Sequence, residues 1–285
     1  MDRFAQWLSQ YKIPIGRSGE QFFNFITDYF SGFFDLLSDV LSSLIDGLVT
    51  FLLFLPSPVV ILLFAAVAYL LTRSLRLVIG VVAGFLLIAN QGLWLETIQT
   101  LALVVCATAT SMLIGVPLGI FLGHRERLYR LILPLLDLMQ TLPTFIYLIP
   151  TLVLFGLGMV PGLVATVVFS VPTVIRLTYL GISSVPPALQ EAGAAFGASR
   201  HQLLWKIEIP SAMPTIMEGL TQSIMLSLSM VVVAALVGAD GLGKPVVRAL
   251  AAVNVPLGLE AGISIVVLAI ILDRTLKLTS RRSSR

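Results

Sequence analysis

The chain has 285 residues, of which 57% are apolar and only 12% are charged, whereas soluble globular domains carry about 25% charged residues. This composition excludes an ordinary soluble fold and predicts an all-α membrane protein, because the apolar residues form runs near the length of a membrane-crossing helix. The formal net charge of +3 comes from basic residues in the breaks between those runs, a pattern that orients membrane helices and indicates no nucleic-acid partner.

The first predicted element is an amphipathic helix over residues 33–49, with apolar side chains at helical spacing and polar ones on the opposite face. Asp35, Asp39 and Asp46 on the polar face make a crossing of the lipid costly, so we expect this helix to lie along the outer membrane surface. Residues 1–56 are therefore predicted to form an amino-terminal tail and an interfacial helix.

From Pro58 onward the apolar runs predict seven membrane spans, since a helix needs about 20 residues to cross a bilayer. The breaks after the first, third and fifth spans and the tail at residues 277–285 are basic, and alternating spans place all four on one side. The positive-inside tendency makes that side cytoplasmic, with the carboxyl end inside and the amino end outside. The predicted outer loop at residues 238–254 departs from this trend with Lys244 and Arg248. The predicted spans cover residues 57–72, 76–92, 98–122, 132–155, 160–183, 212–236 and 255–274.

Two ionisable residues, Asp137 and Arg176, are the only ones between Leu131 and Val185. Ionisable residues inside membrane spans are functional candidates. Both also lie near the predicted cytoplasmic ends of their spans, where a long arginine side chain can reach water. The sequence leaves both interpretations open.

The break at residues 186–210 is too long and too ordered for a simple connector, and it predicts two short helices joined at Gly197, where glycine supplies a left-handed turn. Ser199 is expected to cap the second helix and Pro210 to end it. A short helix held outside the membrane offers its apolar edge to a partner's groove. The predicted edge consists of Leu203, Leu204 and Ile207.

This segment resembles the EAA loop of bacterial ATP-binding-cassette (ABC) importer permeases, with Glu191-Ala192-Gly193, then Gly197, then Ile207, and Ile209-Pro210 at the family's spacing. Gly193 stands where the family usually has its second alanine, and Ile209 where it usually has leucine. The resemblance implies that the short helix near residues 198–206 fits a cleft on a cytoplasmic ATPase, whose closure is transmitted through it.

Carried over by position, the resemblance implies that Glu191 and Gly197 hold the fold of the loop and that residues 199–205 face the ATPase. A solvated helix charge is the alternative for Glu191, and a helix-start residue is the alternative for Pro210. The expected coupling residues are Glu191, Ala192, Gly193, Gly197, Ser199, Arg200, His201, Leu203, Leu204, Trp205, Ile207 and Pro210.

A wider stretch is similar to the permeases for glycine betaine, proline betaine and choline, notably Ala195-Phe196-Gly197, the run at residues 234–243, and Gln140-Thr-Leu-Pro143-Thr. The resemblance implies an importer core of five helices at residues 98–276, of the methionine-importer type, with two accessory spans at residues 57–97. It also implies a homodimer in the bacterial inner membrane, a cytoplasmic ATPase dimer that binds ATP and magnesium, and an extracytoplasmic substrate-binding protein.

For a quaternary amine, recognition is expected chiefly in the binding protein, where aromatic rings can surround the cation. Contacts inside this chain would use aromatic and methionine side chains of the spans, for which packing in the core is the alternative. These pathway candidates are Phe145, Tyr147, Met225 and Met230.

Enzymatic chemistry is not predicted. Gly238 to Lys244 fits the first seven positions of a phosphate loop, but Pro245 replaces the hydroxyl residue that holds magnesium, and a membrane span precedes the segment instead of a strand. A glycine turn explains it better. His124 and His201 are the only histidines, so no metal-ligand cluster or cofactor site is expected in this chain. The alternatives are a permease for another small solute, an ion-coupled transporter, which would need paired acidic residues, and a structural or sensory membrane protein.

Overall fold

The computed structural model describes residues 15–283 and contains no strand among them, which confirms the all-α prediction. Residues 1–14 of the predicted amino-terminal region and residues 284–285 of the basic tail lie outside the described residues. The helices are α2 (Ile15–Phe54), α3 (Ser57–Thr72), α4 (Leu75–Asn90), α5 (Trp94–Gly123), α6 (Glu126–Thr141), α7 (Leu148–Phe155), α8 (Met159–Ser183), α9 (Pro187–Ala195), α10 (Arg200–Leu203), α11 (Ile209–Ala235), α12 (Gly243–Ala252) and α13 (Val255–Ser283), with a 3-10 turn η1 (Thr144–Tyr147) and a π-helical turn η2 (Leu204–Glu208).

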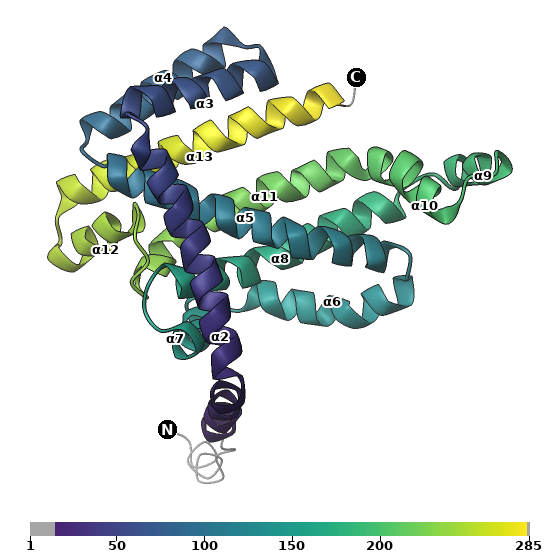
Figure 1. Ribbon diagram of the computed structural model, residues 1–285, viewed down its shortest axis with the longest axis horizontal. Helices are drawn as coiled ribbons and strands as arrows, with labels where there is room; N and C mark the ends of the chain where they lie inside the picture. The colour runs from purple at the N-terminus through teal and green to yellow at the C-terminus, as the bar shows by residue number, and fades with distance from the viewer. Residues whose placement is uncertain (1–14, 284–285) are drawn as a thin grey trace, which may run out of the picture.

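Helix α8 lies at the centre of the bundle, packed along both α5 and α11. Figure 1 shows these helices running along the long axis of the molecule, with α6 on one side and α13 and the α3–α4 hairpin on the other. Helices α9 and α10 lie at one end of this axis, and α7 and α12 lie toward the other end (Figure 1). The bundle therefore presents two different ends, one for each side of a membrane.

Small residues bring α5 and α8 into close contact. Gly115, Gly119 and Gly123 recur every fourth residue on α5, so they share one face. A Cβ atom added to Gly119 would lie 2.9 Å from the carbonyl oxygen of Ile175, which leaves no room for a side chain. Close backbone approach of this kind drives helix association in membranes, where apolar burial alone gives little.

The predicted span at residues 132–155 is wrong as a single helix. The chain bends by 103° between Glu126–Thr141 and Thr144–Phe155. Leu142 has an extended backbone (φ −63°, ψ 135°) and Pro143 follows it. Proline disfavours helical backbone in the residue before it and cannot donate to the helix ladder. The bend therefore has a local cause at Pro143.

The number of spans also differs from the prediction. By length and composition, five described helical segments can cross a membrane, or six if the bent pair counts as one span. Helices α3 and α4 have 16 residues each, about 24 Å of helix, which is shorter than the ~30 Å hydrocarbon core. The five are Gly19–Phe54, Trp94–Gly123, Met159–Ser183, Arg200–Ala235 and Val255–Leu276.

Helix α2 contains the predicted interfacial helix at residues 33–49 and is kinked at Phe30. It is long and apolar enough to count as a candidate span. It packs on α5, α7 and α8, and Figure 1 shows it crossing the direction of the long bundle helices instead of running along them. Such a direction agrees with a helix on the membrane surface, and the surface placement stays a prediction.

The glycine segment that imitates a phosphate loop forms a turn followed by α12. Gly238 and Gly241 have positive φ angles of 90° and 117°, and the amide of Leu242 donates to Oγ1 of Thr100, 2.8 Å away, which ties the turn to α5. The predicted loop at residues 238–254 thus contains a helix that the sequence analysis missed, whereas its interpretation as a glycine turn is confirmed.

Candidate functional site

The segment between α8 and α11 has the local structure that the sequence predicts at its first turn. Gly197 has a φ of 77° and ends α9. The hydroxyl of Ser199 accepts from the amide of Gln202, and the Gln202 side chain accepts from the amide of Ser199, 2.8 Å away. This reciprocal capping box starts α10. The predicted pair of short helices joined at Gly197 is confirmed.

The predicted end at Pro210 is wrong. Helix α10 continues through η2 directly into α11, so that Arg200–Ala235 forms one continuous helical stretch. Pro210 lies in the first turn of α11, and a proline is tolerated in a first turn because its missing amide has no partner there. The predicted coupling segment, residues 186–210, therefore continues without a break into α11.

The predicted apolar edge is partly internal. Leu203 and Ile207 lie over Gly193, where an added Cβ atom would be 2.6 Å from Cδ2 of Leu203 and 2.5 Å from Cδ1 of Ile207. The two short helices thus pack on each other, and glycine at this position allows the close contact. The remaining apolar residue of the edge, Leu204, lines a pocket of 560 Å³ between α5 and α11, together with Trp205.

Other side chains of the coupling segment face outward at the end of the bundle. Phe196 is 94% exposed, and Leu189 and Trp205 are also exposed. The side chain of Glu191 is exposed and makes no hydrogen bond or ion pair within residues 15–283, so its expected role in the fold of the loop stays a prediction. The remaining predicted coupling residues Ala192, Arg200 and His201 are exposed as well.

A buried carboxylate that the sequence analysis missed fastens this segment to α5. Glu208 is only 6% exposed, and its Oε2 lies 2.7 Å from Nε2 of His124. The other ring nitrogen, Nδ1, lies 2.9 Å from the carbonyl oxygen of Ile120. A carbonyl oxygen only accepts, so Nδ1 donates, and a proton lies between Nε2 and the carboxylate. The contact joins residues 84 positions apart, which no short-range pattern could reveal.

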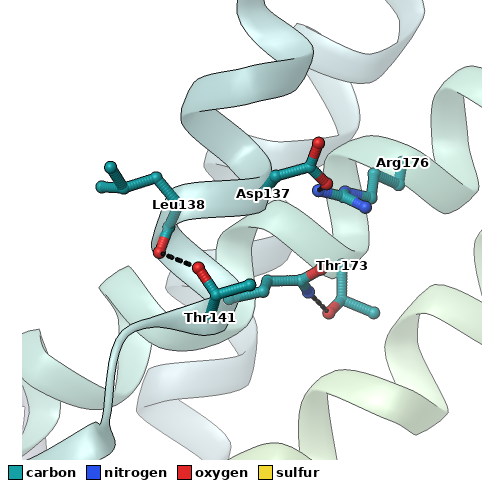
Figure 2. A network of polar contacts seen from close by, with 6 residues as sticks. Asp137, Leu138, Thr141, Thr173 and Arg176 are labelled. Atoms are coloured by element: carbon teal, nitrogen blue, oxygen red, sulfur yellow. Dashed lines mark hydrogen bonds and ion pairs between the residues drawn. The ribbon is translucent and has the colours of Figure 1, made fainter.

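Asp137 and Arg176, which the sequence left open, form an ion pair between α6 and α8. Nη2 of Arg176 donates to Oδ1 of Asp137 across 2.6 Å. One turn further along, the Gln140 amide donates to Oγ1 of Thr173, also 2.6 Å away. Figure 2 shows Asp137 and Arg176 pointing toward each other from the two helices. We call these four residues the α6–α8 polar seam.

The four predicted pathway residues do not meet at one place. Tyr147 and Met230 are buried in the same apolar cluster, and the Tyr147 hydroxyl donates to the carbonyl of Met139. Phe145 and Met225 are exposed. For Tyr147 and Met230 the structure therefore favours a packing role. Within residues 15–283, no group of three or more His, Cys, Asp or Glu side chains could hold a metal ion.

Comparisons with known proteins agree on one family. Residues 115–285 match the family described as "Binding-protein-dependent transport system inner membrane component". The chain is 45% identical to the glycine betaine transport system permease protein OpuAB of Bacillus subtilis, covering 96% of this chain and 97% of that protein. It is 40% identical to the glycine betaine/proline betaine transport system permease protein ProW of Escherichia coli, covering 95% of this chain and 76% of that protein.

Two further comparisons extend this result. The chain is 42% identical to the glycine betaine/carnitine transport permease protein GbuB of Listeria monocytogenes, covering 86% of this chain and 88% of that protein. A chain of the MetNI methionine ABC transporter, in an inward-facing conformation, superposes with a TM-score of 0.60 at 23% identity, covering 65% of this chain and 93% of that one. This likeness is one of fold.

Proposed function

This chain belongs to the family of binding-protein-dependent transport system inner membrane components, and from that premise we propose that it is the permease subunit of an ABC importer for glycine betaine or a related quaternary amine. The observation that carries the proposal is the 45% identity to a glycine betaine permease over 96% of the chain. Proline betaine, choline and carnitine are the related solutes whose uptake should be compared with that of glycine betaine.

The coupling segment supports a separate ATPase as the source of energy. It places exposed apolar side chains, Leu189, Phe196 and Trp205, together at one end of the bundle. A partner that covers them would move the segment, and the continuous helix Arg200–Ala235 would carry that movement into the membrane. We propose that this partner is a cytoplasmic ATPase dimer, which binds ATP and magnesium, and that two copies of this chain enclose the pathway.

The proposed orientation puts the coupling segment and the carboxyl end in the cytoplasm, and the amino end outside. Figure 1 shows that the turn between α5 and α6 lies toward the same end of the bundle as α9 and α10. Arg125 lies in that turn, Arg127 follows in the first turn of α6, and α10 begins with Arg200, as the positive-inside tendency requires of the inner face. The opposite end, with α7 and α12, would meet the extracytoplasmic binding protein.

Reconstitution tests the proposal directly. Proteoliposomes that contain this chain, the ATPase encoded beside it and the binding protein should accumulate labelled glycine betaine only when ATP is present. Gly197→Pro should abolish uptake and ATPase binding, because proline cannot adopt a φ of 77°, whereas Gly197→Asn, which tolerates the left-handed turn, should keep both. Uptake by this chain alone without ATP would contradict the proposal.

A further inference from the structure

The α6–α8 polar seam lies between α6 and the candidate span Met159–Ser183, away from the helix ends. Arg176 precedes the end of α8 at Ser183 by seven residues, or about 10 Å at the rise of an α-helix. Asp137 lies eleven residues after the start of α6 at Glu126, or about 16 Å along that helix. The two charges therefore lie deeper than residues at the helix ends that reach water directly.

The seam is only partly covered by the rest of the chain. The side chain of Asp137 is 56% exposed and that of Arg176 is 28% exposed. Charged side chains within a membrane span face the interior of a bundle or a water-filled cavity, because lipid cannot solvate them. We therefore expect the face of α6 that carries Asp137 to be turned to the interior of the assembly or to a water-filled space, and not to lipid.

An interruption of the helix beside the seam points to the same space. Helix α6 ends at Thr141, one residue after Gln140, and the chain bends by 103° before η1. Irregular backbone at membrane depth is tolerated where it is buried in protein or lines a water-filled cavity. Transporters place solute sites at such interrupted helices. The bend and the exposed ion pair are independent observations, and each agrees with a water-filled space beside α6.

The seam retains hydrogen-bonding capacity that the chain itself does not use. A guanidinium group carries five N–H donors, and among the described residues that of Arg176 donates from Nη2 to Asp137. Its Nε is buried without a partner among those residues, so the remaining N–H groups on the two Nη atoms are the ones a solute could reach. Tyr179 lies three residues further along α8, on the same face, and its ring stacks on that of Tyr129 with centroids 3.4 Å apart. A guanidinium, a carboxylate and an aromatic pair are thus near one another.

We propose that the α6–α8 polar seam is a contact site for a small zwitterionic solute during its passage. The Arg176 guanidinium would donate to the carboxylate of the solute, and the Asp137 carboxylate with the ring of Tyr179 would attract its quaternary ammonium group. The site rests on the proposed function, which supplies a solute of this chemistry. Its two charges match a zwitterion and neutralise each other when the solute is absent.

Single and reversed variants test this role in the complete reconstituted importer. Arg176→Gln and Asp137→Asn should each lower glycine betaine uptake roughly tenfold or more, the effect of losing one charge-assisted hydrogen bond. ATP hydrolysis stimulated by the loaded binding protein should stay within about twofold of wild type, because assembly and coupling are unchanged. As a matched control, Glu126→Gln removes an exposed ion pair with Arg130 on the same helix and should leave uptake unchanged.

The reversed double variant, Asp137→Arg with Arg176→Asp, separates solute contact from helix attachment. If the pair only joins α6 to α8, the reversed pair restores uptake, and that result would overturn the inference. If the solute contacts the pair, uptake stays low although the stimulated ATPase activity shows an assembled importer. If the wild-type importer takes up glycine betaine and Arg176→Gln takes it up equally well, the contact site is refuted but the proposed function stands. If the wild-type importer takes up no glycine betaine, the proposed function is refuted as well.

Discussion

Helix α8 meets two of its neighbours, α5 and α6, in contrasting ways. Against α5 the contact is close and built on small residues, and the Oγ atoms of Ser111 and Ser170 lie 2.6 Å apart in a buried position. Against α6 the contact consists of the polar seam and the stacked Tyr129–Tyr179 pair, it is partly exposed, and Leu136 is the only buried residue of α6. From this comparison we expect α5 and α8 to move as one body, and the contact between α6 and α8 to open to water more readily.

The His124–Glu208 contact joins the coupling segment to the pair of helices α5 and α8. Gly123 packs against Ile182 of α8, and His124, the next residue, holds Glu208 of η2. A displacement of the coupling segment would therefore reach α5 and α8 together, and the polar seam beside them would change its width. Four substitutions test this division of the bundle into a rigid and a movable part.

The largest effect is expected at the close contact. Gly119→Leu places a side chain against the backbone of Ile175, which cannot move aside, so we expect a loss of about 3 kcal/mol of stability or more. Thermal unfolding in detergent measures it. Gly262→Leu is the matched control, because an added Cβ atom there meets nothing within 4 Å. Equal stability of the two variants would refute a rigid α5–α8 contact.

A smaller loss is expected where the coupling segment is fastened. Glu208→Ala removes the partner of His124 and should cost about 1.5–3 kcal/mol, the range for hydrogen bonds to charged groups. Uptake per ATP hydrolysed should fall several-fold, because the segment would move without α5. Glu191→Ala, at an exposed position, serves as the control for stability. Unchanged coupling in Glu208→Ala would argue against this route of transmission.

The third effect concerns the buried hydroxyl pair. Ser111→Ala removes the contact with Ser170, whose hydroxyl keeps a bond of 3.3 Å to the carbonyl of Val167. We expect a loss near 0.6 kcal/mol, as interhelical hydrogen bonds in membranes average. Ser229→Ala, an exposed serine bonded within its own helix, is the reference variant. A loss above about 2 kcal/mol would contradict this expectation, because it exceeds what an interhelical hydrogen bond contributes in a membrane.

The smallest loss of stability is expected in the polar seam. Gln140→Ala breaks the bond to Thr173, which is only partly buried, so water can replace the lost partner and the cost should stay below that of Ser111→Ala. The two variants can be compared in the same thermal unfolding experiment. A larger loss of stability for Gln140→Ala than for Ser111→Ala would mean that the seam is closed to water and stabilises the bundle. The proposed difference between the α5 and α6 sides of α8 would then be wrong.

Local chemistry explains which parts of the site were predictable. The turn at Gly197 and the cap at Ser199 depend on residues at most three positions away, and both predictions are confirmed. The prediction that the second helix ends at Pro210 was wrong because local preferences do not decide it. A proline is equally suited to the position after a helix end and to the first turn of a helix. Which of the two applies depends on whether α10 and α11 are collinear, a tertiary property.

Composition and short-range patterns determined that this chain is a membrane-embedded helical bundle, that residues 186–210 form two short helices, and that Asp137 and Arg176 are candidates for a functional role. Those features follow from side-chain transfer energies and from backbone preferences that act over a few residues. Only the tertiary structure decided that Asp137 pairs with Arg176 and that His124 holds Glu208, because contacts across 39 and 84 positions arise from how whole helices pack. The bend after α6 depends on both local sequence and tertiary packing. Pro143 interrupts the helix locally, and the packing of α7 against α8 sets the new direction of the chain.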